Sequence, residues 1–172
     1  MERAVVEAAI REAFAGVRLG SGVSLREAQA VDTFTAGLSE RELAALPRPE
    51  LTDDWAAVPH EELERDCTAY LDAEGLRYYL PAFMLWLLDR YNDDELRLSP
   101  GPDLAVIGTI MSLDQRERHP LGFFELLSPG QRRAIGLYVR ALPDLVDLNY
   151  EDAAKMARAW RDVWSHEITD DA

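Results

Sequence analysis

The residues of this sequence that could do chemistry are concentrated between His60 and Cys67. His60 and Glu64 are four residues apart and would share one face of a helix, with Glu61 and Asp66 close by. Histidine, cysteine and carboxylate side chains are the ligands that zinc prefers. The second histidine of a zinc motif is missing, however, and acidic residues at a helix start are explained by the helix dipole. The pattern therefore predicts a solvated helix start, with no metal site and no cofactor.

Nucleophilic catalysis also has little support in the sequence. Cys67 has no base beside it, although His119 could reach it in the folded chain. Ser21 and Gly22 lie in a glycine-containing turn, yet the chain contains neither a GxSxG pattern nor a phosphate-binding loop. We therefore assign no catalytic residue and expect a protein that is not an enzyme. A hydrolase with a dispersed site of histidines and carboxylates, with or without a divalent metal, is the alternative.

Carboxylates are the remaining candidates, and they gather in the middle of the chain. The net charge is −14, from 32 acidic and 18 basic residues. Residues 51–100 hold 12 acidic and four basic residues, so this third of the chain carries over half of the excess. Such a cluster can form a docking surface or a merely solvated face. The candidate binding residues belong to three short acidic runs: Asp53, Asp54, Glu61, Glu62, Asp93 and Asp94.

The negative charge also restricts the class of partner. Phosphate backbones and anionic membranes would be repelled by the average surface, so we expect no nucleic-acid and no membrane partner. A basic protein would be attracted, and an immunity protein that masks a basic toxin is one concrete form of this hypothesis. Two alternatives stay open: an acidic surface without a specific target, and a homo-oligomer formed through the face of Trp160 and Trp164.

Length and cysteine content bear on domain organisation and compartment. A chain of 172 residues is expected to form one domain, residues 1–172, around a single core. The lone Cys67 cannot form an internal disulfide, and residues 2–12 mix charged and apolar side chains, unlike a signal peptide. The uncharged stretch 78–88 is well short of the ~20 apolar residues that cross a bilayer. We therefore expect a cytoplasmic protein.

The elements that must position these residues are predicted to be helices. Apolar residues recur at spacings of three and four in residues 2–15, 25–34, 130–142 and 150–164, and alternating strand patterns are absent. A loop at 47–59 carries Trp55, and a short helix follows Pro59. Residues expected to begin helices, as caps or as parts of capping boxes, are Ser24 with Glu27, Ser39 with Glu42, Asp72, and Ser128 before Pro129.

The central element is the apolar segment 73–90. Pro81 removes one backbone donor there and predicts a kink near Tyr79. The aromatic residues of this segment could line a ligand pocket, but their helical spacing favours the core. Residues 104–111 predict a further helix, with Ile107 to Met111 facing inward. The fold class is therefore all-α: a single compact multi-helix domain with a central proline-kinked apolar helix.

Four segments of the sequence resemble a bacterial domain-of-unknown-function family, numbered six-seven-one-four. Together they cover most of the chain, and they match in core and capping residues rather than in catalytic ones. The resemblance implies a shared helical fold and carries no established activity. The segments are GVSLREAQAVD at 22–32, LDAEGLRYYLPAFMLW at 71–86, LLSPGQRRAI at 126–135 and EDAAKMARAWRDVW at 151–164.

Overall fold

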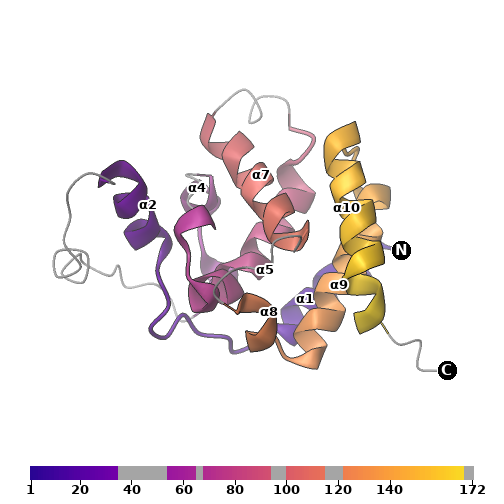
Figure 1. Cartoon of the computed structure of the whole chain (residues 1–172), viewed down its shortest axis with the longest axis horizontal. Coiled ribbons are helices and arrows are strands. Elements are labelled where there is room, and N and C mark those ends of the chain that lie inside the picture. The colour runs from indigo at the N-terminus through magenta and orange to yellow at the C-terminus, as the bar shows by residue number, and fades with distance from the viewer. Residues whose placement is uncertain (35–53, 65–67, 94–99, 115–121, 169–172) are drawn as a thin grey trace.

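The structure, a computed structural model, describes residues 1–34, 54–64, 68–93, 100–114 and 122–168 (Figure 1). Within these ranges the chain is helical and contains no strand, which confirms the all-α prediction. The α-helices are α1 (Arg3–Ala13), α2 (Leu25–Phe34), α4 (His60–Leu63), α5 (Ala73–Arg90), α7 (Pro100–Asp114), α8 (Phe123–Leu126), α9 (Pro129–Leu145) and α10 (Tyr150–Asp162), and the 3-10 helices are η1 (Trp55–Ala57), η2 (Thr68–Tyr70) and η3 (Trp164–Glu167).

Helix α5 lies at the centre of the core. Thirteen of its 18 residues are buried, because α1, α7, α8, α9 and η1 all pack against it. Its first turn is capped as predicted, since the Asp72 carboxylate accepts a hydrogen bond from the Gly75 amide at 2.7 Å. Pro81 lies inside the helix, and the kink near it stays a prediction. The aromatic side chains of α5 belong to the core rather than to a pocket: Tyr78, Tyr79, Phe83 and Trp86 are buried.

Two further predicted helix starts are confirmed in detail. The Ser24 amide donates to the Glu27 carboxylate at 2.8 Å, and the Glu27 amide donates to the Ser24 hydroxyl at 3.2 Å. Ser128 and Gln131 make the same reciprocal pair at the start of α9. The helix predicted after Ser39 lies outside the described residues. Helix α9 does not end at Pro143 as expected, because the Val146 amide still bonds to the Leu142 carbonyl at 3.1 Å.

Helix α7 corrects one prediction. Ile110 is fully buried, but the exposed fractions of Ile107 and Met111 are 38% and 63%, so the segment 107–111 does not face inward as a whole. The helix is apolar on all sides, and its sequence therefore gives no period from which to choose the buried face. The core side is set by contacts with α5 and α10, which cover one flank of α7.

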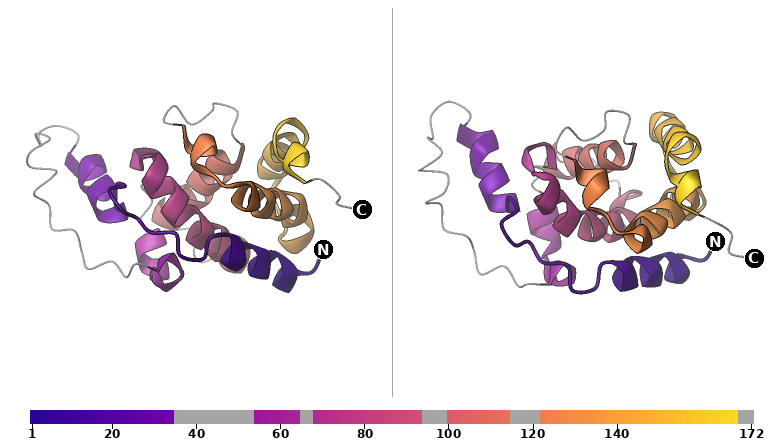
Figure 2. Two further views of the ribbon diagram at one scale, coloured as in Figure 1. Left: turned by 90° about the horizontal axis from the view of Figure 1, so that it is seen from below. Right: turned by 60° about the horizontal axis from the view of Figure 1, so that its bottom comes forward.

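The C-terminal helices fold back over α9 and α7. Figure 2 shows α10 beside α9 and α1 along the other side of α9. Trp164 at the start of η3 is fully buried, and its indole donates to the Leu113 carbonyl of α7 at 2.7 Å. Trp160 is half-buried beneath the Arg140 guanidinium. Trp164 therefore packs inside its own chain and cannot contribute to the oligomer face proposed from the sequence.

Candidate binding surface

The structure describes four of the six acidic residues that were predicted to bind a partner. Asp53 and Asp94 lie outside the described residues. Asp54 is exposed and caps η1, because its carboxylate accepts a hydrogen bond from the Ala56 amide at 3.0 Å. Glu61 is exposed in the first turn of α4, where the positive end of the helix dipole favours a carboxylate. Local helix geometry thus accounts for the position of both side chains.

Glu62 joins α4 to α2. Its half-buried carboxylate accepts a hydrogen bond from the Arg26 guanidinium at 3.2 Å. An ion pair at the surface, with one exposed side chain, contributes about 1 kcal/mol or less to stability. The pair therefore holds the two side chains only weakly, and another cation could replace Arg26.

Arg90 brings two of the predicted acidic runs together. This residue ends α5, and its guanidinium lies 3.1 Å from the Asp93 carboxylate and 3.5 Å from that of Glu64 at the end of α4. Glu64 also accepts a hydrogen bond from the Trp86 indole at 3.2 Å. The acidic run after Pro59 and the run after Arg90 are therefore one surface in three dimensions. The sequence did not predict Glu64 as a binding residue, because its partners are 22 and 26 positions away.

We refer to Glu61, Glu62, Glu64 and Asp93 as the acidic surface. Arg26 pairs with Glu62, and Arg90 pairs with Glu64 and Asp93, so the four carboxylates and two guanidiniums together carry a formal charge of −2. The Arg26 side chain is 54% exposed and that of Arg90 is 36% exposed, while the carboxylates of Glu62 and Glu64 are half-buried. The arrangement can therefore accept basic side chains, and it has no group that could act as a nucleophile.

The metal hypothesis finds no geometric support in the described residues. His60 is exposed, and the Glu64 carboxylate that would complete its helical pair is bonded to Trp86 and Arg90. No group of three or more histidine, cysteine or acidic side chains within the described ranges has the geometry to hold a metal ion. Asp66, Cys67 and His119 lie outside these ranges.

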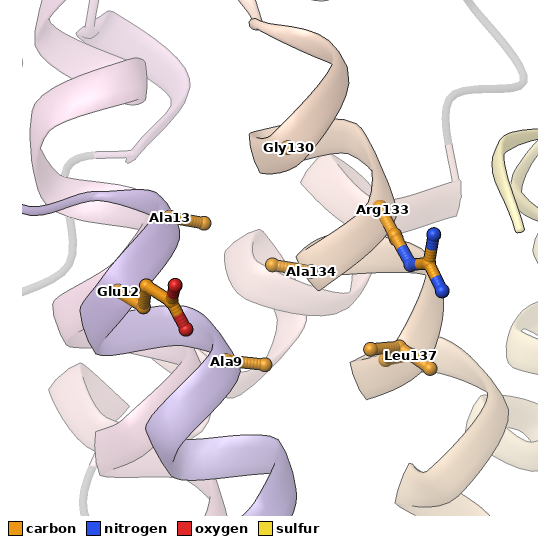
Figure 3. A pocket seen from close by; sticks show the side chains of 7 residues that line it. All are labelled: Ala9, Glu12, Ala13, Gly130, Arg133, Ala134 and Leu137. Carbon is orange, nitrogen blue, oxygen red and sulfur yellow. The ribbon is translucent and has the colours of Figure 1, made fainter.

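Two open grooves flank α1. The first, of about 280 Å³, runs between α1 and α9 over a floor of small side chains, with Glu12 on α1 and Arg133 on α9 (Figure 3). The second, of about 400 Å³, separates the end of α1 from η1 and is lined by Arg11, Asp54 and Trp55 among others. Neither groove is lined by a histidine. The side chains that line the two grooves include isolated charged groups, and they do not form a catalytic arrangement.

No helix among the described residues has the length and apolar character needed to span a bilayer.

Comparisons with known proteins place the chain in a family. The searches of curated proteins and of solved structures returned no match. The model of the "Family of unknown function (DUF6714)" matches residues 2–168, which is nearly the whole chain. The chain therefore belongs to this family of unknown function.

Proposed function

We propose that this protein is a non-enzymatic binding module whose acidic surface docks a basic protein. The observation that carries the proposal is the position of Arg90, which joins Glu64 and Asp93 into one surface. More than half of the net charge of −14 belongs to the third of the sequence that contributes these residues. An immunity-like role, in which this chain masks a basic toxin, is one concrete form of the proposal.

Electrostatics gives the proposal a definite signature. A negative surface speeds the encounter with a basic partner, and the effect weakens as salt screens the charges. Arg26 and Arg90 occupy the carboxylates of the free protein through ion pairs that are at most partly buried. Lysine or arginine side chains of a partner can therefore displace them at small cost. Binding should accordingly be strongest at low salt.

The test is a pull-down from the source cells with a charge-reversed variant. In Glu61→Lys with Glu62→Lys, two carboxylates of the acidic surface become ammonium groups, and a partner captured at low salt should be lost. The matched control is Glu125→Lys with Asp144→Lys, which makes the same change in charge at exposed positions of α8 and α9. The control should retain the partner. Equal recovery with both variants would remove the acidic surface from consideration.

The alternative of a hydrolase makes a different prediction. It needs a histidine and at least two carboxylates around one groove, and the described histidines, His60 and His166, line neither groove. Elemental analysis of the purified protein tests its metal-dependent form. A bound stoichiometric metal, lost together with hydrolytic activity in His60→Ala, would favour the hydrolase over the binding module.

A further inference from the structure

Arg26 of α2 occupies one carboxylate of the acidic surface in the free protein. Its guanidinium donates a hydrogen bond to Glu62 Oε1 at 3.2 Å, across 36 positions of the sequence. A guanidinium is also the group that a basic partner would bring to this carboxylate. The chain therefore carries an internal competitor at the surface to which a partner would dock.

The base of α2 is fixed, and this holds Arg26 close to Glu62. Two residues before α2 begins, the Val23 amide donates to the Asp72 carboxylate at the start of α5 at 2.9 Å. The cap at Ser24 then sets the direction of the first turn, in which Arg26 lies. A group that is tethered beside its partner acts at a high effective concentration. A single basic side chain from solution must therefore compete with a cation that is already in place.

The two members of the pair differ in exposure. The side chain of Arg26 is 54% exposed, whereas that of Glu62 is 20% exposed. The guanidinium can move into water at little cost. The half-buried carboxylate is solvated less completely, so loss of its cation is unfavourable unless another cation replaces it. The geometry therefore favours exchange of one cation for another over simple opening of the pair.

We propose that the Arg26–Glu62 pair is an autoinhibitory contact, which weakens docking at the acidic surface until a basic partner displaces Arg26. The inference rests on the proposed function, because it concerns the regulation of the same surface. A partner with one basic side chain exchanges one cation for another and gains little. A partner with several can displace Arg26 and also reach the exposed Glu61. The contact thus favours densely basic partners over singly charged ones.

Removal of Arg26 should therefore strengthen binding. In Arg26→Gln, the Glu62 carboxylate has no internal cation to exchange. The expected decrease in Kd is about two- to fivefold, the range that corresponds to the free energy of one surface ion pair. Helix α2 should keep its place in this variant, because it packs against η2 and is fixed through the Val23 amide.

Titration of the full chain with a labelled deca-arginine peptide at low salt, followed by fluorescence anisotropy, tests the inference. Arg161→Gln is the matched control, since it makes the same change in charge and also removes an ion pair, that of Arg161 with Asp162 at 2.7 Å. Asp162 is 51% exposed, so water can replace the lost cation there. Figure 1 shows α10, which carries this pair, on the opposite side of the molecule from α2. Arg26→Gln should bind the peptide about two- to fivefold more tightly than Arg161→Gln.

Two further variants locate the effect. Glu61→Lys with Glu62→Lys should lose most of the peptide binding, which would place the peptide on the acidic surface. In a Glu62→Gln background, Arg26→Gln should bind no more tightly than Arg161→Gln.

The outcomes separate the two proposals. Equal affinities of Arg26→Gln and Arg161→Gln would overturn the autoinhibitory contact and leave the docking of a basic protein standing. A gain from Arg26→Gln that persists without the Glu62 carboxylate would do the same. Peptide binding that survives the charge reversal at Glu61 and Glu62, or that is absent from every variant and from the original chain, would instead remove the proposed function and this inference with it.

Discussion

The two ends of α5 are fixed in different ways. At the N-terminal end, the loop before α2 lies directly on the first turn of the helix. Asp72 accepts hydrogen bonds from the amides of Val23 at 2.9 Å and Gly75 at 2.7 Å. A Cβ atom added to Gly22 would lie only 2.6 Å from the Gly75 amide nitrogen. This end depends on the close approach of two backbones, which only glycine permits.

At the C-terminal end, side chains make the connection. The Tyr91 hydroxyl donates to the buried Asp152 carboxylate at 2.8 Å and accepts from the Asn149 amide at 2.9 Å. Asn92 exchanges two hydrogen bonds with the backbone of Asp147, at 3.0 and 3.1 Å. These bonds tie the end of α5 to the start of α10. We refer to this contact as the α5–α10 joint.

Neighbouring side chains at the C-terminal end of α5 have different roles. Tyr91 and Asn92 serve the α5–α10 joint, whereas their neighbours Arg90 and Asp93 belong to the acidic surface. Asp152 is 6% exposed and has hydrogen-bonding partners inside the chain, so its removal leaves a buried donor unsatisfied. Asp93 is partly exposed, and its carboxylate accepts a hydrogen bond from Arg90 that water can replace. Burial, not the type of residue, distinguishes the two roles.

The largest expected effect is at the N-terminal end of α5. In Gly75→Ala the new methyl group would overlap the Val23 carbonyl oxygen and lie 2.9 Å from the Asp72 carboxylate. Alanine favours helix by about 1 kcal/mol, yet forcing two backbones apart should leave a net loss of about 3 kcal/mol. Unfolding in urea measures this net loss of stability. The control is Gly130→Ala in α9, where the nearest atom is 3.9 Å away, so stability should not fall. Equal effects at both sites would show that the close approach is unimportant.

The next effect is at the α5–α10 joint. Asp152→Ala leaves the Tyr91 hydroxyl and the side-chain amide of Asn149 without the carboxylate oxygen that accepts from both. The substitution should destabilise the protein by about 2 to 3 kcal/mol. Glu151→Ala, one residue away and exposed, is the control and should cost far less. Thermal unfolding followed by circular dichroism measures both. A loss at Asp152 no greater than that at Glu151 would contradict the structural role of the joint.

Tyr138 of α9 contacts α5 between the two ends of that helix, and it should make the stability of the protein depend on pH. Its buried hydroxyl donates to the Met84 carbonyl of α5 at 2.9 Å, and burial raises the pKa of Tyr138 well above its usual value. The unfolded chain therefore loses this proton first, at about pH 10. The resulting stability is fully present below pH 10 and is lost as pH rises further. Tyr138→Phe should cost about 1 kcal/mol at neutral pH and make the alkaline loss shallower. An unchanged alkaline slope would refute this assignment.

The sequence predicted what local geometry determines. The helix caps at Ser24, Asp72 and Ser128 depend on residues within three positions, and all three are present as expected. The burial of the α5 aromatics followed from their spacing. By contrast, a helix that is apolar all round has no preferred face, which is why the exposure of Met111 was not foreseen.

Long-range pairing was beyond the same reasoning. Glu64 and Arg90 are 26 residues apart, and Tyr91 and Asp152 are 61 apart. Nothing in either local pattern indicates the partner, because helix packing brings the two segments together. The acidic runs were thus recognised one by one, while their union into a single surface, and the buried role of Asp152, required the fold.

The smallest expected change in stability is at Asp93. It can be compared directly with the change at Tyr91, which lies only two residues away. Asp93→Ala removes the partly exposed ion pair with Arg90, which keeps Glu64 as a partner, so we expect the free energy of unfolding to change by less than about 0.5 kcal/mol. Tyr91→Phe, two residues earlier, should cost about 1 to 2 kcal/mol, since the buried Asp152 carboxylate and the partly buried backbone amide of Asn149 both lose a hydrogen-bond partner. Chemical denaturation of both variants under one set of conditions measures the difference. If Asp93→Ala proved as costly as Tyr91→Phe, its carboxylate would be a structural group, and the acidic surface would lose one of the four positions on which docking of a basic protein depends.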